Sequence, residues 1–200
     1  MNFTPDNLYH VYNQGNDKQL IFSLVEDYFI FLRMIRKYIS PHAEIIAYCL
    51  MPNHFHLLIY TDERVAETIK QGGLLIDPLT NGFRKLLSGY ARIYNKINNK
   101  TGSLFRQKTK VKNLSFDTSG SAHNLQDYYF NCLHYIHQNP LRASIVNRLE
   151  DWEFSSFKDY AGLRNGTLCN KDLANKYCSY HPETFIKTSY QIIPSSVNTF

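Results

Sequence analysis

Two β-rich segments on either side of Pro52-Asn53 constrain the fold more than any other feature of this sequence. The first, residues 43–51, reads AEIIAYCLM, and the second, residues 54–60, reads HFHLLIY. Branched and aromatic residues favour strands, and so short a connection between two strands is typical of a β-hairpin. We therefore predict an antiparallel hairpin, beside which the remaining elements must be arranged.

A strand and a helix are predicted before this hairpin, and a helix and a strand after it. Residues 8–13 (LYHVYN) form the first strand, and Ser23 and Glu26 have the spacing of a capping box for the helix that follows. Residues 80–98 are amphipathic with helical period, and residues 104–114 alternate like a strand. The order β-α-β-β-α-β is that of the ferredoxin-like split unit. The expected fold class is therefore α+β, an antiparallel sheet with two helices on one face.

A third helix is predicted over residues 124–139, closed by Asn139-Pro140 because the residue before proline disfavours helical geometry. This helix is expected on the face of the sheet that the other two helices leave open. Beyond Gly162 the apolar pattern weakens. We divide the chain into a domain at residues 1–162 and a C-terminal appendage of unknown role at residues 163–200.

The positive charge is concentrated in one segment. The chain has 22 basic and 17 acidic residues, and residues 78–116 hold nine of the basic residues and no acidic one. This segment also carries Phe83, Tyr90, Tyr94 and Phe105, and basic residues interleaved with aromatics suit a polyanion such as nucleic acid. A solvated helix face followed by a lysine-protected edge strand is the alternative. The candidates for phosphate contacts are Lys85, Arg92, Lys96, Arg106, Lys108 and Lys110.

Several classes of protein are excluded by simpler features. No stretch of 18 residues is free of charge, which argues against a membrane-spanning helix. The N-terminal residues lack the basic-then-apolar pattern of a signal peptide. The four cysteines form no C-x-x-C pair and are interpreted as reduced thiols. We expect a cytoplasmic protein.

His54 and His56 stand one residue apart on the second strand of the hairpin. Strand geometry directs both imidazoles to the same face, while Phe55, Leu57 and Ile59 point to the other. Two neutral imidazoles on one face can share a divalent metal ion. The alternative is that both are merely half-exposed strand residues.

Tyr135 and Asn139 are spaced i, i+4 on the third helix and therefore lie on one face of it. If this helix packs on the open face of the sheet, both can approach the two histidines. Asn139 could then add a carbonyl oxygen to the imidazoles, a donor set that favours Mg²⁺ or Mn²⁺ over structural zinc. The alternatives are a core tyrosine with a bonded hydroxyl and a helix end before proline.

Four segments together carry a family resemblance. In order and spacing, MPNHFHLLI, GSLFRQKTKV, YIHQNPLRASIV and WEFSSFKDY resemble the single-tyrosine HUH transposases, and within them the REP-associated tyrosine transposases and their insertion-sequence relatives. The resemblance extends over about residues 8–160. It implies a ferredoxin-like fold and metal-dependent cleavage of single-stranded DNA beside a hairpin. It also implies that His54, His56 and Asn139 are metal ligands and that Tyr135 is the nucleophile.

The function implied is a transposase: a DNA endonuclease and strand transferase that acts through a 5′-phosphotyrosine. Two alternatives stay open, a non-catalytic nucleic-acid-binding module on the same fold and a metal-dependent hydrolase that uses water. The expected partner is single-stranded or hairpin DNA. Whether the protein is a monomer or a homodimer, and whether Tyr135 serves its own subunit, also stay open. His137 is left as a structural or DNA-contacting residue, and His10 is given no role.

Overall fold

The computed structural model describes residues 1–115 and 125–191. Its main sheet has four strands in the order β2-β3-β1-β6, and each neighbouring pair is antiparallel. The strands are β1 (Asn7–Gln14), β2 (Glu44–Met51), β3 (His54–Thr61) and β6 (Lys110–Asn113). The predicted hairpin is confirmed, because Met51 pairs with His54 across Pro52-Asn53.

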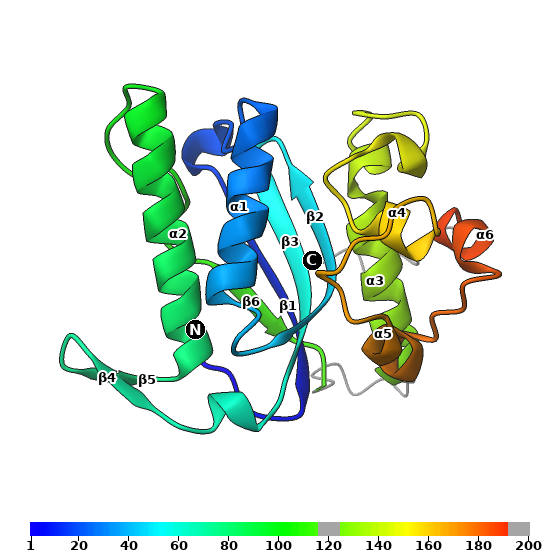
Figure 1. Cartoon of the computed structure of the whole chain (residues 1–200), viewed down its shortest axis with the longest axis horizontal. Coiled ribbons are helices and arrows are strands. Elements are labelled where there is room, and N and C mark those ends of the chain that lie inside the picture. Colours follow the sequence, from blue (N-terminus) through cyan, green and yellow to red (C-terminus); the bar gives the residue numbers. More distant parts are fainter. Residues whose placement is uncertain (116–124, 192–200) are drawn as a thin grey trace.

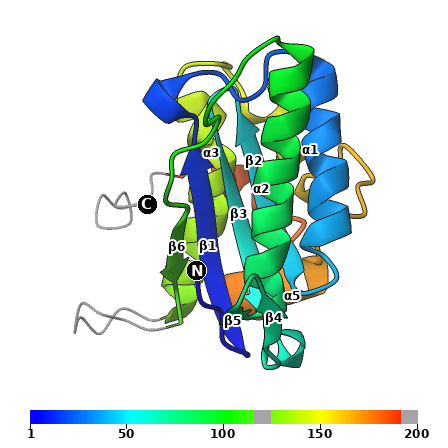
Figure 2. The same ribbon diagram turned by 90° about the vertical axis from the view of Figure 1, so that its left-hand side faces the viewer.

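Helices cover both faces of this sheet (Figures 1 and 2). Helices α1 (Val25–Tyr38) and α2 (Pro78–Ile97) lie side by side on one face, and α3 (Leu125–Arg142) lies on the other. The chain after α3 adds α4 (Phe157–Tyr160), α5 (Lys171–Cys178) and α6 (Phe185–Ser189) on the same side as α3. The mixed α+β class with an antiparallel sheet is therefore as predicted.

Smaller elements complete the chain and were not predicted. A short hairpin, β4 (Ile69–Gln71) and β5 (Leu74–Ile76), projects from the body before α2 (Figure 1). The described residues also form the 3₁₀ turns η1 (Asn16–Lys18), η2 (Glu63–Val65) and η3 (Leu149–Asp151). Within the described ranges, no helix is both long enough and apolar enough to span a bilayer.

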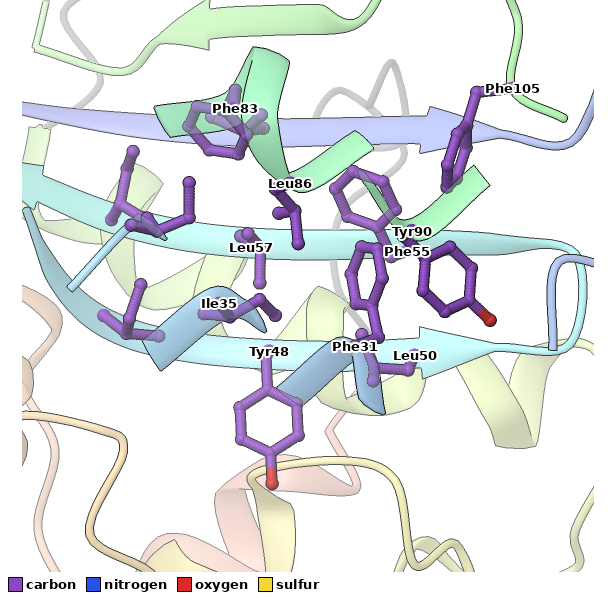
Figure 3. Packing of buried hydrophobic residues seen from close by; sticks show 14 of the residues in the cluster. Phe31, Ile35, Tyr48, Leu50, Phe55, Leu57, Phe83, Leu86, Tyr90 and Phe105 are labelled. Atoms are coloured by element: carbon purple, nitrogen blue, oxygen red, sulfur yellow. The ribbon is translucent and has the colours of Figure 1, made fainter. Parts of the chain in front are cut away.

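The alternation of the strands separates two hydrophobic cores. Side chains such as Phe55 and Leu57 of β3 point towards α1 and α2, where they meet Phe31 and Tyr90 (Figure 3). Leu58, on the opposite face of the same strand, belongs to a second core beneath α3. Because neighbouring residues of a strand face opposite sides, His54 and His56 on the α3 face alternate along β3 with Phe55 and Leu57 of the first core.

The second core includes residues of the segment predicted as an appendage. Phe185 of α6 is 1% exposed, and its ring lies 5.3 Å from that of Phe157 and 5.5 Å from that of His134. His134 Nδ1 is 3.0 Å from Ser189 Oγ, and Gln138 Nε2 donates to the Ser189 carbonyl at 2.8 Å. Helix α6 thus packs on α3, and residues 169 and 170 bond to β2. Residues 192–200 lie outside the described part. The domain boundary at residue 162 stays a prediction.

The start of α1 differs from the prediction. Ser23 and Glu26 do not form the capping box. Instead the buried Asp27 carboxylate accepts from the backbone N–H groups of Ser23 and Leu24, at 2.8 and 2.9 Å. The Ser23 hydroxyl is 2.7 Å from the Tyr94 hydroxyl of α2. The cap is therefore made by Asp27 of α1 itself, and the Ser23 hydroxyl is used in a contact with α2 instead.

Two other boundaries also differ. Only residues 110–113 of the predicted 104–114 strand are paired as β6, because the preceding residues form a loop that contacts the end of β1 through isolated bonds and an isolated bridge, Gly15–Phe105. Helix α3 continues past Pro140 to Arg142. Proline has no N–H to give to the Ile136 carbonyl, and the Asn139 side chain donates there instead, at 3.3 Å. The predicted start of this helix at residue 124 lies outside the described residues.

We expect Phe185→Ala to lower the free energy of unfolding by about 3 to 5 kcal/mol, because it leaves a cavity in the core beneath α3. Phe29→Ala is the matched control, since Phe29 is 47% exposed. Urea denaturation measures both. Equal, small effects would mean that the segment after residue 162 does not stabilise the fold.

Candidate functional site

Two imidazoles of β3 stand on the face of the sheet that α3 covers. His54 and His56 lie on the same side of the strand, with ring centroids 5.0 Å apart and planes nearly perpendicular. His56 is 4% exposed, whereas His54, at the start of the strand, is half-buried. The predicted arrangement of the pair on one face is therefore present.

The neighbouring strand β1 adds two more rings to this face. Tyr12 pairs with His56 in the β1–β3 register, and its ring stacks at 5.6 Å from the imidazole. His10, two residues before Tyr12, is fully buried, and its Nε2 lies 2.9 Å from His56 Nδ1. The buried His10–His56 hydrogen bond thus fixes how the His56 ring is turned.

Each imidazole of the pair has its Nδ1 engaged. His54 Nδ1 is 2.6 Å from the Asn53 side-chain oxygen, and the Asn53 amide nitrogen donates to the Lys18 carbonyl. Because that oxygen can only accept, His54 Nδ1 carries the proton and Nε2 keeps its lone pair. In His56, Nδ1 contacts His10 Nε2, and the tautomer in which Nδ1 donates this bond leaves the lone pair on Nε2.

Burial keeps these histidines neutral. Removal from water lowers the pKa of His54 to about 4 and that of His10 to about 3. The pKa of His56 falls well below its usual value, first by burial and then through the neighbouring His10 and His54. A neutral imidazole with a free Nε2 is the form that binds a metal ion. No cluster of three or more His, Cys, Asp or Glu side chains suited to a metal occurs in residues 1–115 or 125–191.

Tyr135 of α3 faces the histidines on the α3 side of the sheet. Its ring centroid is 5.9 Å from that of His56 and 6.3 Å from that of His10, edge to face in both cases. Helix α3 is held there by Cys132 and Ile136, which are fully buried in the second core. The position of the Tyr135 ring follows from the geometry of α3, because residue 135 lies on the flank of the helix next to its buried stripe.

Opposing effects act on the pKa of Tyr135, of which burial and Arg142 are the two largest. Its half-buried position raises the pKa of the phenol, and the Arg142 guanidinium, 5.5 Å above the ring, lowers it. The Arg142 side chain therefore sits where it can stabilise negative charge on the phenol oxygen.

Asn139 lies one turn beyond Tyr135 and is half-buried. Its side-chain nitrogen donates to the carbonyls of Tyr135 and Ile136, at 2.9 and 3.3 Å. The contacts recorded for this side chain are thus with its own helix, and no described donor reaches its Oδ1. A carbonyl oxygen in that position can still serve as a ligand.

The predicted phosphate-binding residues are all exposed but do not share one surface. Arg106, Lys108 and Lys110 follow the loop and edge strand that border β1. Lys85, Arg92 and Lys96 lie along another flank of α2, spaced by whole helical turns. The aromatics interleaved with them are unavailable for base stacking, since all four are buried: Phe83, Tyr90, Tyr94 and Phe105.

Other histidines near Tyr135 have structural contacts. His137 is buried, and its Nε2 lies 2.7 Å from Ser156 Oγ. Ser156 in turn accepts from the Tyr48 N–H of β2 at 3.0 Å. These bonds connect α3 to the segment after η3, and they turn His137 away from the two histidines of β3.

Sequence reasoning missed His10, Tyr12 and Lys112. Alternation in the first strand places His10 and Tyr12 on one face, but only the register of β1 with β3 shows which face that is. Lys112 pairs with His10 from the other side, and its charge helps to lower the pKa of His10.

Comparisons with known proteins agree with the motifs. No family model matches the chain. A protein of Haemophilus influenzae named "Putative REP-associated tyrosine transposase" is 28% identical over 138 residues, which is 68% of this chain and 72% of that protein. A solved REP-associated tyrosine transposase, bound to a REP hairpin, superposes with a TM-score of 0.55 at 19% identity, over 85% of this chain and 91% of that one. The resemblance to this family is thereby confirmed.

Proposed function

We propose that this relative of the REP-associated tyrosine transposases is a metal-dependent endonuclease and strand transferase for single-stranded DNA. The observation that carries the proposal is the position of Tyr135, whose ring stands edge-on to His56 and His10 across the α3 face of the sheet. A nucleophile of one element next to the oriented His56 imidazole of another is the arrangement such chemistry needs. The ferredoxin-like assignment belongs to the same proposal and is supported by the strand order β2-β3-β1-β6.

The reaction follows from the groups present. The Tyr135 phenol oxygen attacks the scissile phosphorus and forms a 5′-phosphotyrosine with the fragment downstream of the cut. The bond from phosphorus to the 3′ oxygen breaks, and that oxygen leaves as a 3′-hydroxyl after taking up a proton. The phenol proton passes to solvent. Because one phosphodiester replaces another, a 3′-hydroxyl from a second strand can reverse the step.

His54 and His56 would hold the divalent cation through their Nε2 atoms, with the Asn139 carbonyl oxygen as a third ligand. Mg²⁺ or Mn²⁺ bound there would neutralise charge on the scissile phosphate. The protein's own part is to hold the two imidazoles neutral and oriented, and to place Arg142 over the Tyr135 ring.

The proposed partner is single-stranded DNA next to a hairpin. The solved relative is bound to a REP hairpin, and the exposed basic residues of this chain can contact phosphates. These are Lys85, Arg92, Lys96, Arg106, Lys108 and Lys110. A homodimer is compatible with this proposal, and so is a separate role for residues 163–200.

We expect wild-type protein, incubated with Mg²⁺ or Mn²⁺ and a labelled hairpin that carries an unpaired flank, to form a covalent adduct that survives denaturation. Tyr135→Phe removes the attacking oxygen and should form none. His54→Ala or His56→Ala should slow adduct formation by at least about 100-fold, as when one charge-stabilising group is lost. Denaturing gels measure all three.

The control is Tyr128→Phe, which alters a half-buried tyrosine two turns earlier on α3 and should keep the adduct. Cleavage without any adduct would instead identify a hydrolase that uses water. Binding without cleavage would identify a non-catalytic module.

We further expect His10 to determine metal affinity, although it is not itself a ligand. His10→Leu removes the bond to His56 Nδ1 and should weaken Mn²⁺ binding about 10- to 100-fold, the usual effect of losing an outer partner of a ligand. His10→Gln can keep a hydrogen bond to His56 and should lose less Mn²⁺ affinity than the Leu variant. Calorimetric titration with Mn²⁺ measures both.

Thermal unfolding separates this role from simple stabilisation. A purely structural His10 would lower the melting temperature in the Leu variant and leave its Mn²⁺ affinity equal to that of the wild type. That result would contradict the assignment.

A further inference from the structure

A basic groove lies on the other side of the sheet edge from Tyr135. It is formed between α2, the loop of residues 102–109 and the edge strand β6, and its volume is about 1110 Å³. Four cations line it, and none of its lining residues is acidic: Arg84, Arg106, Lys108 and Lys110. None of these four makes an ion pair with a carboxylate among the described residues.

The floor of the groove is apolar, in contrast to its rim. Leu87 and Ala91 line it from α2, and Tyr9 and Val111 line it from the sheet. A duplex offers proteins its phosphates and groove edges, whereas unpaired nucleotides also expose the faces of their bases. An apolar floor between cationic rims therefore matches a single strand better than a duplex.

The outer wall of the groove is held in place before any ligand binds. The Arg106 N–H donates to the Gln14 carbonyl at 2.9 Å, and the Asn13 side chain donates to Thr109 Oγ1 at 2.9 Å. Gly102, with φ of +87°, makes the turn into this wall. A preformed wall lowers the entropic cost of binding, because the loop is already ordered.

The groove is connected to the histidine face through one row of the sheet. Lys110, at the rim, pairs with Tyr12, and Tyr12 pairs with His56. Neighbouring strands are about 4.8 Å apart, so this row crosses only about 10 Å from β6 to β3. A chain that leaves the groove over Lys110 thus arrives next to Tyr12 and His56.

We propose that this groove binds the single-stranded DNA segment that adjoins the cleaved phosphate, with bases on the apolar floor and phosphates on the four cations. This inference rests on the proposed function, and it separates the binding of the flank from the chemistry at Tyr135. It also assigns a contact to Arg84, and it leaves Lys85, Arg92 and Lys96, on another flank of α2, outside the groove.

The test measures binding in the Tyr135→Phe background, where no cleavage occurs. Two labelled DNAs are compared by fluorescence anisotropy over a range of salt concentrations, a blunt hairpin and the same hairpin with an unpaired flank. Arg84→Gln with Lys108→Gln should reduce the slope of log affinity against log salt by about 1.4 for the flanked DNA, since each phosphate contact to a single strand contributes about 0.7. The slope for the blunt hairpin should not change.

The matched control is Arg33→Gln with Lys37→Gln, which removes two exposed cations of α1 outside the groove. It should leave both slopes as they are. The proposal would be overturned if Arg84→Gln with Lys108→Gln reduced the salt slope equally for the two DNAs, or did not reduce it for the flanked DNA. Tighter binding of a single-stranded RNA of the flank sequence would also overturn it. The adduct assay with unaltered Tyr135 is scored separately, so an absent adduct refutes the nuclease and a constant slope refutes the groove.

Discussion

The antiparallel pairing of β1 with β3 is the interaction on which the rest of the structure depends. Its register places Tyr12 opposite His56 at the centre of the sheet, where both faces are covered by helices. A shift of one residue would turn His10 and Tyr12 towards α1 and α2, and would bring Tyr9 and Val11 to the α3 face. The apolar contacts of Tyr9 and Val11 in the first core therefore also fix the histidine cluster.

The parts of the fold that follow from local periodicity were predictable. The hairpin, the strand at residues 8–13 and the helix at residues 80–98 appear within a few residues of their predicted bounds. The approach of Tyr135 to His56 also follows, because H-x-H spacing and one helix on the open face leave few other arrangements. The roles of these residues stay predictions until the variants are measured.

Features set by strand register, or by one local side chain taking the place expected of another, could not be predicted. The hydrogen bond of His10 to His56 depends on strand register, and the cap of α1 depends on a buried aspartate that competes with the expected serine. Helix α3 passes through Pro140, and the Asn139 side chain donates to the Ile136 carbonyl, which has no N–H partner at residue 140. In each case a side chain far away, or of unexpected conformation, outweighs the local propensity.

The amide of Asn139 connects fold and chemistry in a way that bears on its role. Its nitrogen is committed to the helix, so its oxygen must point away from those carbonyls. An alanine here would lose both the helix bonds and the oxygen, whereas an aspartate would keep an oxygen and place a charge beside unsatisfied carbonyls. A loss of activity in an Asn139 variant would therefore combine an effect on helix stability with the loss of a ligand. Variants of His54 and His56 distinguish these two effects better, because the Nδ1 atoms of these histidines bond to Asn53 and His10 and not to the backbone of α3.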